Sequence, residues 1–237
     1  MNIYIDVGNT NIKITFEDNT LIFKTHNQKI IKEIKNQLSF KRPISNIYGT
    51  CVVPQMKKIL EKYFMKISGK SISWINRDYK LNVDISINDN LGSDLIAISA
   101  YASENYKNAI VVNLGTATTF SHIKNNKLMG VNISPGIELQ YNSLINNASL
   151  LKKNKLQYIN KSIGTNTNES ISIGIINSAI ETIKAMCLKI DRKAEVVISG
   201  GNAVYIFDHI EYKYIPEVTT LGIKKIFLLN EKQKIII

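Results

Sequence analysis

The sequence DVGNTNIK at residues 6–13 joins two stretches that have the pattern of β-strands. Residues 2–6 lead into it, and Ile12, Ile14 and Phe16 alternate with polar residues after it. Such alternation is typical of a strand with one buried face. Gly-Asn-Thr between the two stretches has the composition of a tight turn. We therefore predict a strand, a turn and a returning strand here, with a third strand at 21–23.

The same layout occurs a second time at NLGTATT, residues 113–119. An apolar strand is predicted at 109–114, and strands at 118–123 and 127–133 follow it. Each of the two turns is thus followed by a β-meander and then by helices. Such a repeat indicates two copies of one α/β fold facing each other across a central cleft. We predict the two halves at residues 1–107 and 108–237.

Apolar residues at helical spacing predict the helices of both halves. We expect helices near 30–38, from Pro54 onward, at 95–101, after residue 136, over 173–187 and at 222–229. Further strands are expected at 45–53 and 195–198. Pro54 suits the first turn of its helix, because a proline there loses no helical hydrogen bond.

Composition narrows the class of protein. The chain has 237 residues, of which 44% are hydrophobic, and this is enough for a large buried core. Cys51 and Cys187 have no zinc or redox spacing, which favours a reducing compartment. The net charge of +11 comes from lysines spread along the polar positions of the predicted helices, without an aromatic-basic cassette. We expect no nucleic-acid partner.

No apolar run reaches the roughly 20 residues that a membrane span needs. The N-terminal sequence MNIYIDVGNT has no basic region followed by a long apolar run, so no signal peptide is predicted. We therefore expect a cytoplasmic protein without a membrane partner.

The two glycine turns have the chemistry of a phosphate site. Gly8 lets a phosphate approach the backbone N–H groups, and Asn9 and Thr10 add neutral donors. The carboxylate of Asp6 would repel a phosphate, so its use is through Mg²⁺, usually with water between them. Gly115 and Thr116 offer the same donors from the opposite wall. Either turn alone is better explained as an ordinary β-turn, since all these residues favour turns. The occurrence of two such turns favours a phosphate site.

Other candidates also have two readings. Asp94 is either a first-turn acid of its helix, favoured by the helix dipole, or a general base that takes a proton from an attacking hydroxyl. The Ser199-Gly200-Gly201 sequence either permits close approach of adenine or ribose or simply connects two elements. Thr167 is either a substrate contact or a helix N-cap.

Several motifs together resemble the type III pantothenate kinases, members of the actin/Hsp70/hexokinase-like superfamily with ribonuclease H-like halves. Residues 6–13 resemble DxGNTxxK/R, and residues 113–119 resemble DxGTAxT. The remaining matches, in chain order, are CVVP at 51–54, GSDL at 92–95, the segment 130–136, IGTNT at 163–167, SGG at 199–201 and LGI at 221–223. The resemblance covers nearly the whole chain, and the motifs occur in the family's order.

This resemblance implies phosphorylation of pantothenate to 4′-phosphopantothenate with ATP, the first step of coenzyme A synthesis. It implies an Mg²⁺ ion held through Asp6, a monovalent cation (K⁺ or NH₄⁺) at Asn113, and a homodimer. Asp94 would be the proton acceptor. ATP contacts are implied for Asp6, Val7, Gly8, Asn9, Thr10, Asn11, Ile12, Lys13 and Thr116, and pantothenate contacts for Gly92, Ser93, Asp94, Leu95 and Thr167.

Three positions depart from the family pattern. Leu95 replaces the arginine of GxDR, and Asn113 replaces the acid of DxGT. Ile85 stands where the family often has a substrate-contacting tyrosine. These departures leave two alternatives open: a catalytically weakened, nucleotide-binding regulatory relative, and a different small-molecule kinase or a phosphatase of the actin-like superfamily.

Overall fold

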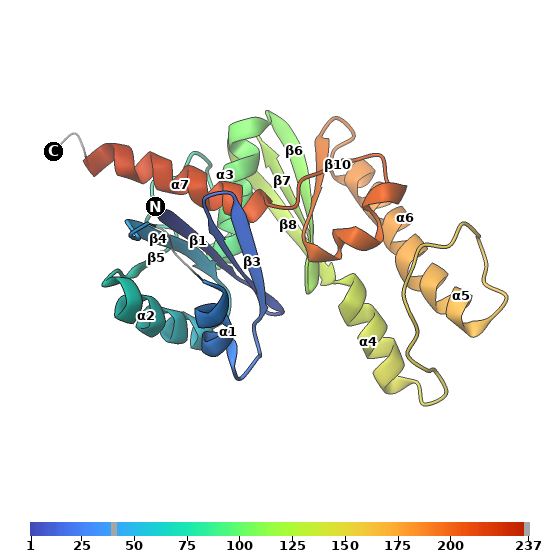
Figure 1. Ribbon diagram of the computed structural model, residues 1–237. Coiled ribbons are helices and arrows are strands. Elements are labelled where there is room, and N and C mark those ends of the chain that lie inside the picture. Colours follow the sequence, from blue (N-terminus) through green and yellow to red (C-terminus); the bar gives the residue numbers. More distant parts are fainter. Residues whose placement is uncertain (39–41, 235–237) are drawn as a thin grey trace. The chain divides into compact units, whose positions relative to one another are not determined.

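The computed structural model describes residues 1–38 and 42–234 (Figure 1). The chain forms two compact units. Unit 1 contains Met1–Asn105, Asn126–Leu128 and the chain from Val218 onward, and unit 2 contains Tyr106–Asn125 and Met129–Glu217. The predicted first half ended at Lys107, close to the end of the first stretch of unit 1. The units nevertheless differ from the predicted halves, because the last helix belongs to unit 1.

Unit 1 is built on a five-stranded sheet in the order β3-β2-β1-β4-β5. β1 and β2 are antiparallel, as are β2 and β3, and this confirms the predicted meander. β4 runs parallel to both β1 and β5. The strands are β1 (Asn2–Val7), β2 (Asn11–Phe16), β3 (Asn19–Lys24), β4 (Asn46–Cys51) and β5 (Ile72–Trp74).

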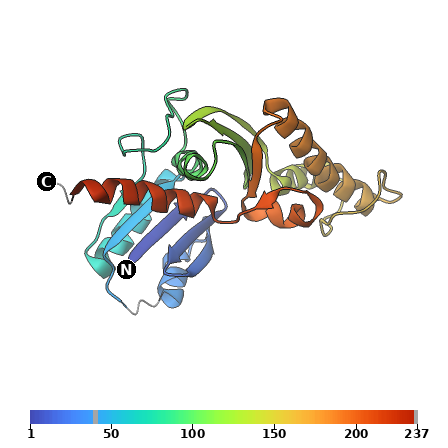
Figure 2. The same cartoon turned by 90° about the horizontal axis from the view of Figure 1, so that it is seen from above.

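Helices cover both faces of this sheet. α1 (Ile30–Gln37) and α2 (Pro54–Ser68) lie on one face, and α3 (Ser93–Asn105) and α7 (Val218–Lys234) lie on the other (Figures 1 and 2). Pro54 is the first residue of α2, as predicted. The alternating isoleucines point into the core beneath α1 and α2; its fully buried members include Ile3, Ile5, Ile12, Ile14, Leu60 and Phe64.

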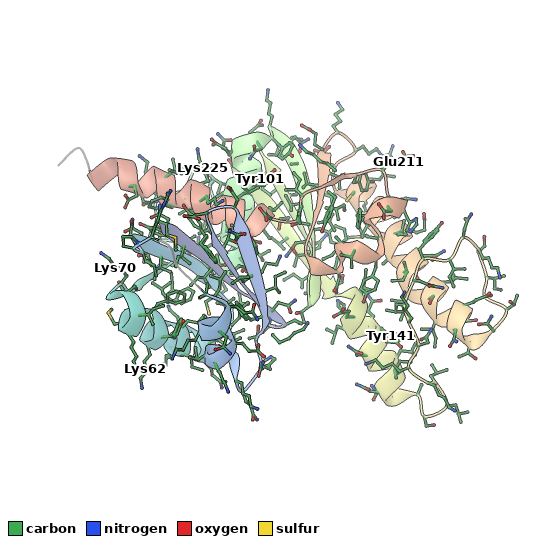
Figure 3. All side chains as sticks on the ribbon, viewed as in Figure 1. Lys62, Lys70, Tyr101, Tyr141, Glu211 and Lys225 are labelled. Atoms are coloured by element: carbon green, nitrogen blue, oxygen red, sulfur yellow. The ribbon has the colours of Figure 1, made fainter. Side chains whose placement is uncertain are left out.

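The last helix, α7, packs closely on α3 and on the sheet. A Cβ atom at Gly222 would overlap the backbone carbonyl of Ala97, so this glycine sets the approach of the two helices. Lys225 pairs with Glu104 on α3 at 2.6 Å between Nζ and Oε1 (Figure 3). The ring of Phe227 lies 4.2 Å from that of Tyr48 on β4, centroid to centroid. α7 therefore completes the helical layer of unit 1.

Unit 2 repeats the arrangement with a sheet in the order β10-β9-β6-β7-β8. β6 and β7 are antiparallel, and β6 and β9 are parallel, just as β1 pairs with β2 and β4 in unit 1. The strands are β6 (Asn108–Leu114), β7 (Ala117–Lys124), β8 (Lys127–Pro135), β9 (Glu195–Ser199) and β10 (Lys213–Tyr214).

The helices of unit 2 are α4 (Ile137–Asn147), α5 (Thr167–Ser172) and α6 (Ser178–Ile190), with the π-helical segment Ile173–Asn177 between α5 and α6. Short 3₁₀ turns cover Gly201–Tyr205 and Phe207–His209. Tyr141 on α4 ties the connection to α5, because its hydroxyl donates to the carbonyl of Asn154 at 2.6 Å (Figure 3).

One helical stretch, Thr167–Ile190, is long and apolar enough to cross a membrane by length and composition. The sequence did not predict a membrane span here, because serine and asparagine residues interrupt the apolar residues of this stretch. Its inward residues Ile176, Ile180 and Ile183 are buried in the core of unit 2. The core helix of a soluble protein passes the same test, so the stretch is weak evidence for a membrane span.

Candidate active site

The turn at residues 8–10 is held in place by hydrogen bonds from both sides. The amide of Gly8 donates to the carbonyl of Asn11 at 3.0 Å. The buried hydroxyl of Thr25 donates to the carbonyl of Gly8 at 2.7 Å, and the Thr25 amide donates to the carbonyl of Thr10 at 3.0 Å. Asn9, at the tip, is exposed. The turn is therefore a fixed loop that can present its polar groups to an anion.

The other residues predicted to contact ATP divide by orientation. Val7 and Ile12 are buried at 1% and 0% exposure, so only their backbones are available to a ligand. Lys13 lies directly opposite Asp6 across β1 and β2, on the same face of the sheet. Asn11 has a buried side-chain oxygen without a hydrogen-bond partner among the described residues.

Asp6 is a desolvated carboxylate near the end of β1. The fully buried hydroxyl of Thr50 donates to its Oδ1 at 2.8 Å. Burial raises the pKa of Asp6, while this hydrogen bond and the charge of Lys13 lower it. The charge of Asp94 adds to the increase in the pKa of Asp6, so the two carboxylates lie close enough to repel each other.

Asp94 lies in the first turn of α3. Its carboxylate folds back over Gly92, where an added Cβ would lie 2.6 Å from Oδ1. Burial raises the pKa of Asp94, and hydrogen bonds from the backbone N–H groups of Leu95 and of Asp94 itself act in the opposite direction. A carboxylate with a raised pKa beside a second carboxylate has the properties of a general base.

Two neighbours of Asp94 have structural roles. The Ser93 hydroxyl accepts a hydrogen bond from the amide of Cys51 at 2.9 Å, which ties the start of α3 to the end of β4. The side chain of Leu95 is buried at 7% exposure. Leu95 therefore occupies a core position and offers no charge in place of the family's arginine.

In unit 2 three segments meet at the end of β6. The amide of Gly136 donates to the carbonyl of Thr116 at 2.9 Å, and the side-chain amide of Asn202 donates to the carbonyl of Gly115 at 3.0 Å. A Cβ atom at Gly136 would overlap the carbonyl of Gly115. Gly200 has φ of +93°, and a Cβ there would overlap the carbonyl of Leu114. Glycines thus allow the three backbones to close around the Gly115-Thr116 turn.

Asn113 has polar neighbours on the adjoining strands. It pairs directly with Thr119 on β7 and with Ser199 on β9, so the three side chains share one face of the sheet. The buried hydroxyl of Thr119 has no hydrogen-bond partner among the described residues. The neutral side-chain oxygens of Asn113, Thr119 and Ser199 fit a monovalent cation better than a divalent one.

Thr167 is the first residue of α5, and the N-cap is its neighbour Asn166. The side chain of Asn166 accepts from the amide of Glu169 at 3.0 Å, and the carboxylate of Glu169 accepts from the amide and hydroxyl of Thr165. These bonds from Thr165, with that from Lys161, lower the pKa of Glu169 to about 2. The exposed Thr167 is therefore not needed as the cap.

The residues predicted for the site separate into the two units. Unit 1 brings together the turn at 8–10, Asp6 and Asp94, and unit 2 holds Asn113, Thr116 and Thr167. The supporting contacts of Thr25, Thr50 and Asn202 were not predicted. No local signal points to them, because each bonds a residue at least 17 positions away in sequence.

The carboxylates of unit 1 fit a magnesium ion that also binds phosphates. Among the described residues no group of three His, Cys, Asp or Glu side chains could hold a metal by itself. Mg²⁺ is usually bound by one or two carboxylates together with waters and phosphates, and Asp6 supplies one such carboxylate. A divalent cation would also offset the repulsion between Asp6 and Asp94.

Solved structures resemble this chain in fold. A conserved Baf-family protein from Campylobacter jejuni has a TM-score of 0.67 and 21% identity, covering 97% of this chain and 99% of that one. The activator of 2-hydroxyisocaproyl-CoA dehydratase from Clostridium difficile, solved with bound ADPNP, has a TM-score of 0.54 and 13% identity, covering 98% and 97%. The paired sheets and their turns define an α/β protein of the actin-like ATPase fold.

Sequence comparison gives the family. The model of type III pantothenate kinases matches residues 2–189. The type III pantothenate kinase of Mycoplasma mobile is 35% identical over 94% of this chain and 97% of its own length, and that of Thermosipho melanesiensis is 31% identical over 88% and 90%. The chain belongs to the type III pantothenate kinase family.

Proposed function

We propose that this protein transfers the γ-phosphoryl group of ATP to the primary hydroxyl of pantothenate, giving ADP and 4′-phosphopantothenate, the first step of coenzyme A synthesis. The observation that carries this proposal is the Asp94 carboxylate, whose pKa burial raises and whose charge acts on Asp6, the residue two positions before the ordered turn at 8–10. Membership of the type III pantothenate kinase family identifies pantothenate as the acceptor substrate.

In the proposed reaction Asp94 takes the hydroxyl proton as the acceptor oxygen forms its bond to the γ-phosphorus. The bond between that phosphorus and the oxygen bridging to the β-phosphate breaks, and ADP leaves. The backbone and polar groups of residues 6–13 and of Thr116 bind ATP. Gly92, Ser93 and Thr167 contact pantothenate, and Leu95 contributes through its backbone.

Two cations belong to the proposal. Asp6 would hold Mg²⁺, usually through water, and the ion would neutralise charge on the phosphates. Asn113 would offer its amide oxygen to K⁺ or NH₄⁺, and the unpartnered hydroxyl of Thr119 supports a site there. A neutral amide binds a cation more weakly than the carboxylate of the family motif does. We therefore expect that a high concentration of K⁺ is needed for full activity.

A coupled assay of ADP release with ATP and pantothenate, with and without Mg²⁺ and K⁺, tests the proposal. Turnover that needs both pantothenate and Mg²⁺ is expected. ATP binding without turnover would instead support the catalytically weakened regulatory relative, which Leu95 and Asn113 favour. Turnover with a different acceptor only would support another kinase of the superfamily.

The proposal includes a cytoplasmic homodimer with no nucleic-acid or membrane partner. Large apolar side chains on β8 and in the connection between α4 and α5 support self-association, since Ile133, Leu150 and Ile163 are 67%, 91% and 78% exposed. We expect light scattering to give twice the mass of the 26.7 kDa chain. A monomer at micromolar concentration would contradict the dimer.

A further inference from the structure

A pocket of about 200 Å³ lies in unit 1 at the carboxyl ends of β4 and β5, beside the first turn of α3. Ligands of open α/β sheets commonly bind at this end of the strands. The lining combines two cationic side chains with a thiol, polar groups and apolar walls, and it contains no carboxylate: Cys51, Lys57, Trp74, Ile75, Asn76, Arg77, Leu91, Ser93 and Ile96.

Lys57 supplies a positive charge at the rim of this pocket, and the nearest described carboxylate on the same helix, Glu61, accepts a hydrogen bond from the Trp74 indole at 2.6 Å. The ammonium group of Lys57 lies 5.8 Å from the centroid of the Trp74 ring. It also lowers the pKa of the Cys51 thiol, which burial raises, so this exposed ammonium group lies near the thiol at the edge of the pocket. Lys57 forms no salt bridge with any residue that the structure describes.

Arg77 is held in position without being neutralised. Its guanidinium donates to the backbone carbonyls of Asn88 and Ile85, the latter at 3.1 Å. Its ion partner Asp89 lies 3.5 Å away, and the Asp89 side chain is 93% exposed, so water screens the pair. Uncharged carbonyls fix the guanidinium and leave most of its charge available to an anion.

The pocket and the candidate base share one loop. Leu91 and Ser93 line the pocket, and Gly92 between them contacts the carboxylate of Asp94. The charge of Asp6 also raises the pKa of the Cys51 thiol. The loop at residues 91–93 therefore borders the pocket and leads directly to the candidate base.

We infer that this pocket receives the carboxylate end of the acceptor, with Lys57 and Arg77 as its counter-charges. The inference rests on the proposed function. Pantothenate carries its reactive hydroxyl at one end and a carboxylate at the other, about 10 Å apart when extended, by ordinary bond lengths. The two methylene groups next to its carboxylate suit the apolar walls formed by Trp74 and Ile96. Lys57 and Arg77 thus supply the charge that Leu95 cannot.

Lys57→Met tests the inference by comparing pantothenate with pantothenol, which has a hydroxymethyl group in place of the carboxylate. Losing one charged partner is expected to raise KM for pantothenate roughly 10-fold to 100-fold. KM for pantothenol and kcat for both should change little. Arg77→Met should act in the same direction, although it also loosens the loop at 85–89.

Lys58→Met is the matched control, because Lys58 is the next residue on α2 and is exposed like Lys57, but does not line the pocket. It should leave both KM values unchanged. If Lys57→Met changes KM equally for the two acceptors, or changes neither, the inference is wrong. The proposed function would still stand in that case, provided that the wild-type protein turns over pantothenate. Absence of wild-type turnover with pantothenate would overturn both.

A second measurement needs no turnover. Cys51 lines the pocket and is partly exposed, whereas Cys187, the other cysteine, is only 2% exposed. Pantothenate without ATP should slow maleimide labelling of Cys51 several-fold, and Lys57→Met should shift that protection to roughly 10-fold to 100-fold higher pantothenate concentrations. Full-rate labelling at saturating pantothenate would place the carboxylate elsewhere.

Discussion

Asp94→Asn is expected to lower turnover with pantothenate by roughly 100-fold or more, the usual scale for loss of a general base. Asparagine keeps the shape and the hydrogen-bond acceptor but cannot take the proton. Steady-state kinetics should show the loss in kcat. Because burial raises the pKa of Asp94, the acid limb of the wild-type pH–rate profile should lie above the ordinary aspartate value of 3.8.

The same substitution should leave the fold as stable or make it more stable. A folded-state pKa above the unfolded value means that the folded protein holds the proton more tightly. The ionised group therefore destabilises the fold, and this cost grows as pH rises from the unfolded pKa to the folded one and persists above it. Asparagine removes the cost.

Asp18→Asn is the control, because Asp18 lies in the exposed turn between β2 and β3. This substitution should change neither kcat nor the stability of the fold. Thermal unfolding at pH 7 provides the comparison. Wild-type kcat in Asp94→Asn would refute its role as the base, and a large fall in melting temperature would mean that lost turnover reflects unfolding.

Gly222→Ala is expected to cost on the order of 3 kcal/mol of stability, the upper range for overpacking. The new methyl group would meet the backbone carbonyl of Ala97, which cannot rotate away as a side chain could. α7 must then move off α3, which also disturbs the ion pair between Lys225 and Glu104. The midpoint of thermal unfolding should fall by roughly 6–12 °C.

Gly174→Ala is the matched control for this change. Gly174 is also helical, but nothing lies within 4 Å of a Cβ placed there. Alanine at that position should be neutral or slightly stabilising, because glycine is the poorer helix former. If Gly222→Ala unfolds at the wild-type temperature, the close packing of α3 against α7 is wrong.

Local pattern was sufficient where a residue's neighbours in sequence decide its conformation. Alternating isoleucines predicted β1 and β2, and Pro54 marked the start of α2 correctly. β5 and β10, with three and two residues, are too short to show a period, and they exist because β4 and β9 provide an edge for pairing.

The site could be predicted only as far as its motifs reach. The turn at 8–10 and Asp94 carry recognisable sequence. The bond from Thr50 to Asp6 and the pocket beside Lys57 join segments that are distant in sequence and meet only when the strands pair. Gly222 was noted only as part of a motif, and its physical reason is the carbonyl of Ala97 on another helix.

The position of α7 sets the order in which the protein can assemble during translation. Residues 1–105 leave the ribosome first, yet α7, the helix that completes the cover of their sheet beside α3, is made last. The stretch 106–217 can fold in the meantime as unit 2. A nascent chain that stops before Val218 therefore leaves the outer face of β1 and β4, with Tyr4 and Tyr48, open to chaperones or to aggregation.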